Sequence, residues 1–149
     1  MDKAQQTIET PQQTIEIKPT FKPEAIEKIF EMIKDFFSIE HQTELKSILK
    51  TGNNANIKLL FKDNGNRLTD TFKKLKEHDF ITCCDKQTLI DWIVKNFEFM
   101  QQSEPKPFKT NTVKGIINKK TNPCKSPIIE IENAEIIKNE IPRNKTMNN

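Results

Sequence analysis

The sequence predicts a mainly α-helical domain, a compact bundle of four to five helices with a minor short β element and flexible termini. Three observations lead to this prediction. Apolar side chains recur at spacings of three and four through the middle of the chain, which is the period of an amphipathic helix. Proline, serine, asparagine, aspartate and glycine stand where such helices would begin and end. The first and last twenty residues are polar, so the apolar residues are concentrated between them.

The length of the chain bounds its domain organisation. It has 149 residues, of which 34% are hydrophobic, and this length fits one domain of ordinary size. We expect a disordered N-terminal tail over residues 1–20, a single helical domain over 21–128 and a frayed C-terminal tail over 129–149.

A short repeat stands in the N-terminal tail. The segment Gln-Gln-Thr-Ile-Glu occurs at Gln5–Glu9 and again at Gln12–Glu16. So short a polar repeat cannot bury a face, which favours disorder. A docked strand around Thr14–Ile17 is the alternative.

A helical hairpin is expected over residues 23–51. Pro23 is suited to the first position of a helix, Ser38 to the cap of a second helix, and Gly52 to its end. The apolar stripe of the first helix consists of Ile26, Ile29, Phe30, Ile33, Phe36 and Phe37, and that of the second of Leu45, Ile48 and Leu49.

The next region combines strand and helix signals. Ile57–Phe61 favours a short strand over a helical turn, because Asn64-Gly65-Asn66 stops it abruptly. A third helix is expected over Arg67–Lys76 with Asn66 as its cap, followed by a short return strand at Phe80-Ile81. This order is similar to that of a winged-helix domain, although Asp70 dilutes the positive charge of the third helix.

Two more helices are expected after Asp85, which is suited to cap the first of them. One side of that helix carries Leu89, Trp92, Ile93, Asn96, Phe97 and Met100. A loop follows over Gln101–Pro107, and a fifth helix begins at Thr110 or Asn111 and buries Val113, Ile116 and Ile117. Gly115 lies inside this helix and weakens it by about 1 kcal/mol relative to alanine.

The C-terminal part has weaker signals. Ile128–Glu132 has the alternation of an edge strand, and one helical turn is possible at Glu135–Asn139.

Several classes of protein are disfavoured. No run approaches the ~18 apolar residues of a membrane helix, and the N-terminus has no apolar secretory signal, so we expect a cytoplasmic protein without a membrane partner. The three cysteines, Cys83, Cys84 and Cys124, and the two histidines, His41 and His78, lack the spacing of a disulfide framework or a zinc site.

No catalytic arrangement is recognisable either. The three glycines are isolated, so no phosphate-binding loop is present. Neither histidine belongs to a known catalytic motif, and the acidic residues fall on polar helix faces. We therefore expect no enzymatic activity and no cofactor.

The clearest functional signal is a segment from Lys106 to Lys125 that contains six lysines and no acidic residue. Lysines attract phosphate, and asparagine and threonine side chains bond phosphate oxygens or base edges. Only Arg67 and Arg143 are arginines, which disfavours sequence-specific reading of guanine. The candidate DNA-binding residues are Lys106, Lys109, Asn111, Lys114, Asn118, Lys119, Lys120 and Lys125.

Other interpretations of this signal remain open. The lysine-rich segment is also typical of a solvated surface in a lysine-rich protein, and an acidic protein partner is a further alternative. The hairpin over residues 23–51 is rich in Phe and Ile, and any apolar surface left uncovered there would serve protein interaction or self-association.

The sequence of residues 57–127 is similar to that of two groups of bacterial proteins. The stretch Leu60–Leu75, then Leu89-Ile90-Asp91-Trp92-Ile93 with Asn96-Phe97, then Pro123-Cys124-Lys125-Ser126-Pro127, resembles a group of uncharacterised proteins of Bacteroides-type bacteria. The first part also resembles the C-terminal region of RteC proteins, regulators carried by conjugative transposons, but the chain lacks that region's Arg/Lys-rich ending. The resemblance implies a regulatory or mobile-element setting, no enzymatic role and no particular functional residue.

Overall fold

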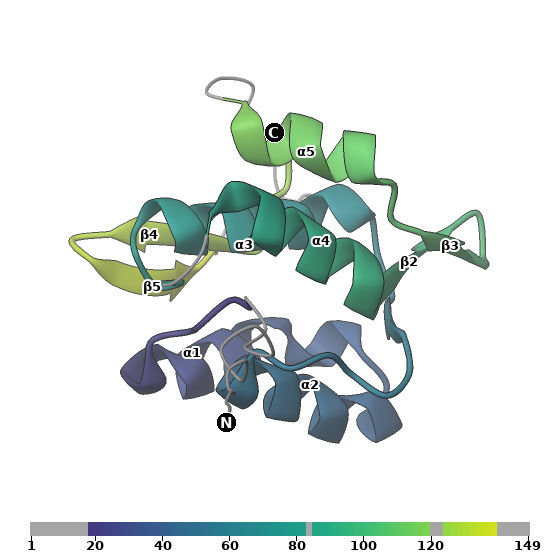
Figure 1. Cartoon of the computed structure of the whole chain (residues 1–149), viewed down its shortest axis with the longest axis horizontal. Helices are drawn as coiled ribbons and strands as arrows, with labels where there is room; N and C mark the ends of the chain where they lie inside the picture. The colour runs from purple at the N-terminus through teal and green to yellow at the C-terminus, as the bar shows by residue number, and fades with distance from the viewer. Residues whose placement is uncertain (1–17, 83–84, 120–123, 140–149) are drawn as a thin grey trace, which may run out of the picture.

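The computed structural model describes residues 18–82, 85–119 and 124–139. Their five α-helices form three tiers (Figure 1). One outer tier is a hairpin of α1 (Pro23–Ile33) and α2 (Ile39–Thr51), joined by a short 3-10 helix, and the middle tier holds α3 (Gly65–Glu77) and α4 (Lys86–Asn96). The other outer tier is α5 (Thr110–Asn118), which packs against both helices of the middle tier.

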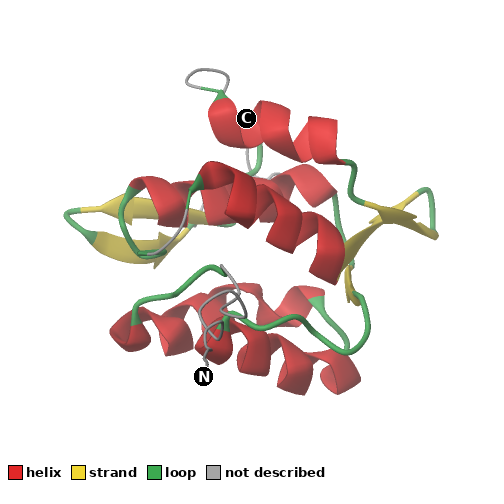
Figure 2. Cartoon of the chain, in the orientation of Figure 1, coloured by secondary structure: helices red, strands yellow, loops and turns green. Residues whose placement is uncertain are grey.

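Two small sheets lie at opposite ends of these tiers (Figure 2). In the first, β2 (Phe97–Gln101) pairs in parallel with β1 (Leu59–Phe61) and antiparallel with β3 (Glu104–Pro107). In the second, β4 (Ile129–Glu132) and β5 (Glu135–Lys138) form an antiparallel hairpin. The prediction of a mainly α-helical fold with a minor β element is therefore confirmed.

The predicted starts of α1, α2 and α4 and the predicted end of α2 are confirmed. Helix α1 begins at Pro23, the Ser38 side chain accepts a hydrogen bond from the His41 N–H at the start of α2, and Asp85 accepts one from the Thr88 N–H at the start of α4. Gly52 ends α2 with a φ of 73°, a left-handed conformation that glycine adopts without a steric penalty.

Two predictions in the middle of the chain are wrong. Helix α3 begins at Gly65 and not at Arg67, because Asn64 caps it by accepting a hydrogen bond from the Asn66 N–H. The fourth helix does not continue to Met100. It ends at Asn96, since the next residues pair with β1 and β3.

The expected loop over Gln101–Pro107 is a β hairpin. Its two-residue turn has Gln102 and Ser103 at φ values of 53° and 65°. Positive φ at both central positions matches the twist of a two-residue hairpin, and residues other than glycine and asparagine seldom adopt it. The sequence therefore carries no obvious turn signal here.

The expectation of a frayed tail from residue 129 is also wrong for residues 129–138. The edge strand expected near Ile128–Glu132 is present as β4, and β5 stands where a helical turn was considered. Ile128, Ile129 and Ile136 are at most 4% exposed and belong to the main core. The return strand expected at Phe80-Ile81 is reduced to a single bridge between Ile81 and Phe21.

The core is continuous from α1 to β5 and has an aromatic centre. Trp92 of α4 contacts the rings of Phe21, Phe72 and Phe97 at centroid distances of 5.5–5.6 Å. Its indole N–H donates to the Gly52 carbonyl, 3.1 Å away. Trp92 therefore joins the end of α2 to the middle tier, as expected for a core residue.

Strand β1 connects the hairpin tier to the rest of the molecule. One edge of β1 pairs with β2. On the other side, the Leu60 N–H donates to His41 Nδ1 at 3.2 Å, and the neighbouring Lys62 N–H donates to the Phe36 carbonyl at 2.8 Å. Both sides of the strand are thus hydrogen-bonded.

The helices of the described residues are short, at most 13 residues long. None of them has both the length and the apolar character needed to cross a lipid bilayer.

Candidate nucleic-acid interface

Helix α5 presents one side to the core and the other to solvent. Val113 and Ile117 are at most 2% exposed and fix the helix against α3 and α4. Phe108, immediately before the helix, packs on Phe99 of β2 at a centroid distance of 4.9 Å. The apolar positions thus determine which side chains of α5 face outward.

Five of the eight predicted residues lie on α5 or at its two caps. All five are exposed, and none of the residues between Pro105 and Lys125 is acidic. We call this surface the α5 face, and it comprises Lys109, Asn111, Lys114, Asn118 and Lys119.

The other three predicted residues do not join the α5 face in the same way. Lys106 lies on β3, is only partly exposed, and its ammonium group is 3.3 Å from the Glu104 carboxylate, which offsets its charge. Lys125 is exposed but lies beyond α5 in the segment that leads to β4. Lys120 lies outside the described residues.

The beginning of α5 offers backbone donors. Lys109 is the N-cap residue and its side chain makes no capping hydrogen bond. The N–H groups of the first turn of a helix have no intrahelical acceptor, and together with the helix dipole they favour an anion there. The cations at Lys109 and Lys114 stand near this end.

Two features of this surface were missed in the sequence. Lys73 of α3 donates a hydrogen bond to the Lys119 carbonyl, which brings a fourth cation to the far end of α5. Gly115 is exposed, and a Cβ atom added to it would meet nothing within 4 Å. A side chain at position 115 would therefore point into open space.

Two cations of α3, Arg67 and Lys74, make contacts within the protein. Arg67 donates to the Ser126 carbonyl at 2.6 Å and pairs with Asp63 at 2.8 Å. Lys74 donates to the Ile129 carbonyl at 3.0 Å. Both side chains thereby attach the C-terminal segment to α3.

A buried carboxylate completes this attachment. Asp70 is 5% exposed, and its Oδ2 atom lies 3.0 Å from the Lys74 ammonium group without the geometry of a hydrogen bond. The two are held by charge attraction, and Glu130 approaches the same ammonium group at 3.4 Å. The predicted third helix therefore uses its charges for internal contacts.

One thiol, that of Cys124, lies in the part of the chain that the structure describes. Burial raises the pKa of the Cys124 thiol, and a protonated thiol is a weak nucleophile. Within residues 18–82, 85–119 and 124–139, no three His, Cys, Asp or Glu side chains are arranged to hold a metal ion. Cys83 and Cys84 lie outside the described residues.

Comparison of the chain with protein-family models, with curated proteins and with solved structures found no match.

Proposed function

We propose that this protein is a small non-enzymatic accessory or regulatory protein that contacts DNA through the phosphate backbone, using the α5 face. The resemblance of the stretch Leu60–Leu75 to RteC-type regulators supports a setting on a bacterial mobile element. The contact would be independent of base sequence, since it relies on lysine rather than arginine.

One observation supports this proposal above the others. Three exposed lysines and two exposed asparagines lie on α5 or at its caps, in a segment whose sequence contains no carboxylate. The ten-residue step from Lys109 to Lys119 covers about 15 Å of helix, which is roughly the length of four phosphate steps along one DNA strand. Counterion release by such lysines is the main source of non-specific affinity.

A winged-helix arrangement would point to a different surface. The order β1, α3, α4 and the β2–β3 hairpin is similar to that of winged-helix domains, in which α4 would be the helix offered to the major groove. The exposed side of α4 carries Lys86 and Lys95, but Asp91 lies between them and accepts a hydrogen bond from Gln87. The segment that contains α5 has no acidic residue between Pro105 and Lys125, so we assign the contact to α5.

Simultaneous replacement of Lys109, Lys114 and Lys119 by alanine tests the proposal. We expect weaker binding to any DNA duplex and a shallower dependence of the binding constant on salt. The slope of log K against log salt should fall in magnitude by roughly 2 to 3, because each lost phosphate contact contributes about 0.9. Fluorescence anisotropy of a labelled duplex at several salt concentrations measures both quantities.

A matched control separates a specific surface from net charge. Lys28, Lys62 and Lys138 are exposed and lie on other elements, so their triple replacement by alanine removes the same charge. Binding by this control should stay close to that of the unmodified protein. Equal losses in both variants, or no binding by the unmodified protein at low salt, would contradict the proposal and favour a merely solvated surface.

A second candidate function is a protein-interaction or self-association module formed by the α1–α2 hairpin. The observation that favours it is Ile39, an aliphatic side chain that is 76% exposed on this hairpin. Replacement of Ile39 by serine should then reduce the sedimentation coefficient of the protein at high concentration. A strict monomer before and after the change would exclude self-association through this residue.

A further inference from the structure

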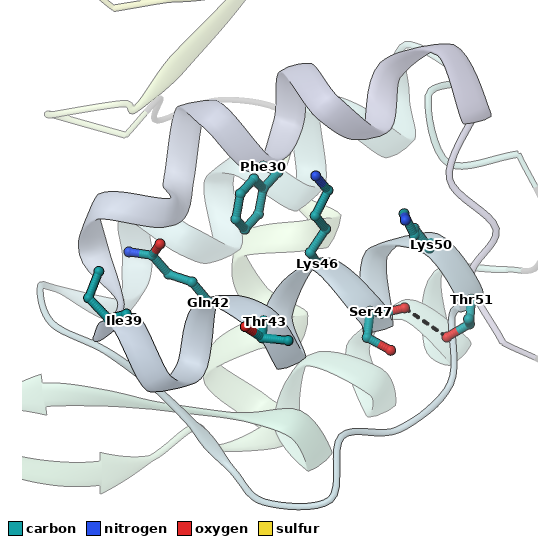
Figure 3. Close-up of a pocket in the computed structure, with 8 residues that line it drawn as sticks. All are labelled: Phe30, Ile39, Gln42, Thr43, Lys46, Ser47, Lys50 and Thr51. Atoms are coloured by element: carbon teal, nitrogen blue, oxygen red, sulfur yellow. Dashed lines mark hydrogen bonds between the residues drawn. The ribbon is translucent and has the colours of Figure 1, made fainter.

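A groove runs between α1 and α2 on the outer side of the hairpin (Figure 3). It has a volume of about 500 Å³. Phe30 reaches into it from α1, Ile39 lies at one end and Thr51 at the other. The end near Ile39 is held in shape by Gln42, whose side-chain amide donates to the carbonyls of Lys34 and Phe37.

The groove combines an apolar floor with positive charge. Lys46 and Lys50 line it, and none of its lining residues is acidic. The Lys46 ammonium group pairs with Glu27 at the edge of the groove and lies 5.2 Å from the centre of the Phe30 ring. The side chain of Lys50 is exposed. The surface therefore suits a segment that carries both aliphatic and acidic side chains.

The described part of the chain begins next to one end of this groove. The Lys18 side chain donates to Asn53 Oδ1, and the Pro19 carbonyl lies against Gly52. Both contacts are at the C-terminal end of α2, directly beyond Thr51. Any residue shortly before Lys18 is therefore tethered close to the groove, which gives it a high effective concentration there.

The residues before Lys18 match the groove in charge and in length. Residues Gln12–Ile17 read Gln-Gln-Thr-Ile-Glu-Ile and contain no basic residue. Six extended residues cover about 20 Å, and the helix from Ile39 to Thr51 covers about 18 Å. Ile15 and Ile17 would share one face of an extended segment.

We propose that residues Gln12–Ile17 occupy the α1–α2 groove of their own chain. Ile15 and Ile17 cover the exposed part of Phe30, and Glu16 pairs with Lys46 or Lys50. The first copy of the repeat, Gln5–Glu9, extends beyond the groove. This inference is independent of DNA binding by the α5 face.

The test compares amide and methyl NMR signals of the full chain with those of charge variants. Replacement of Glu16 by lysine should shift the signals of groove residues such as Ile39, Thr43 and Ser47, while Lys114 on α5 keeps its position. The double variant E16K/K50E should restore the groove signals toward their original positions. The same change at Glu9 is the matched control and should leave the groove signals unchanged.

A second measurement does not depend on these substitutions. Removal of residues 1–17 should shift the same groove signals as E16K, and a peptide of residues 11–17 added to the shortened protein should reverse the shifts. A peptide with Glu16 replaced by lysine should bind several-fold more weakly. Groove signals that are unaffected by truncation would overturn the proposal, and so would shifts that depend on protein concentration, which would indicate a second copy in the groove.

Discussion

Gly65, which is buried, and Gly115, which is exposed, show how differently single residues constrain this fold. A Cβ atom added to Gly65 would lie 2.8 Å from a ring carbon of Phe108 and 2.9 Å from one of Phe99. Gly65 thus lets the β2–β3 hairpin and the start of α5 approach the first turn of α3. Gly115 has no such neighbour, so nothing inside the protein accounts for a glycine at that position.

These two residues allow a matched pair of substitutions with opposite outcomes. Gly115→Ala should raise the free energy of unfolding by about 1 kcal/mol through helix propensity, or the midpoint of thermal unfolding by roughly 3 °C. Gly65→Ala should lower the free energy of unfolding by about 1–3 kcal/mol, because the ring contacts must shift. Urea unfolding followed by circular dichroism measures both. A Gly65→Ala variant as stable as the original protein would show that the rings give way without cost.

Asn96 is a residue whose role the sequence pattern did not reveal. Its position on the apolar side of the fourth helix suggested a packing residue, and it is 1% exposed. Its side-chain amide donates to the Trp92 backbone carbonyl and to Asn54 Oδ1, and its Oδ1 accepts from the Ala55 N–H at 2.7 Å. Asn96 therefore fixes the turn after α2 to the end of α4.

At the scale of elements, the predictable parts of the fold are those with a local chemical signal. Helix α2 has its serine cap and terminal glycine, and α4 has its aspartate cap, so their starts could be predicted from a few neighbouring residues. The β2–β3 and β4–β5 hairpins lack an Asn-Gly or Asp-Gly turn, and long-range pairing and core contacts stabilise them instead.

In the candidate site too, features with a local sequence signal could be predicted and features that depend on long-range contacts could not. The exposed side of α5 could be predicted from the spacing of Val113 and Ile117, because burial of one side determines the other. The approach of Lys73 to Lys119 and the internal use of Arg67 and Lys74 depend on tertiary packing, which spacing along one helix does not report.

The cap of α4 leads to a prediction about pH. Hydrogen bonds from the backbone and side chain of Thr88 lower the pKa of the Asp85 carboxyl. A carboxyl whose pKa is lower in the folded state stabilises the protein above its unfolded pKa, and this contribution is lost as pH falls through the folded pKa. We expect Asp85→Asn, which keeps the acceptor without the charge, to lose less stability than the original protein between neutral pH and pH ~3.

Urea unfolding at each pH gives this difference. Glu27 and Glu40 also have lowered pKa values, but they are present in both proteins, so their effect cancels in the comparison. The same loss of stability with acid in both proteins would show that the Asp85 charge makes no contribution.

At the scale of the whole molecule, one core includes segments from both ends of the described chain. Phe21 lies against Trp92, and Ile129 and Ile136 of the C-terminal hairpin belong to the same cluster. Arg67 and Lys74 also attach the β4–β5 hairpin and the segment before it to α3. The hairpin is therefore an integral part of the folded unit.

A pair of isoleucine substitutions tests this conclusion. Ile129 is 1% exposed and Ile57 is 56% exposed. Ile129→Ala should lower the free energy of unfolding by about 2–5 kcal/mol, whereas Ile57→Ala should change it by less than about 0.5 kcal/mol. Trp92 fluorescence and circular dichroism should report the same transition in each case. Equal small effects for both variants would mean that the C-terminal hairpin folds separately.

The position of β1 has a consequence for the slowest motions of the protein. The strand contributes to one sheet, and on its other side the Leu60 amide is bonded to His41 of α2. This amide therefore becomes accessible only when the hairpin tier separates from the middle tier. In deuterated solvent, the Leu60 amide proton should therefore exchange among the slowest of all amide protons. Its opening free energy should be close to that of global unfolding. Amides in the outer turns of α1 and α5 should be replaced much earlier, by local fraying.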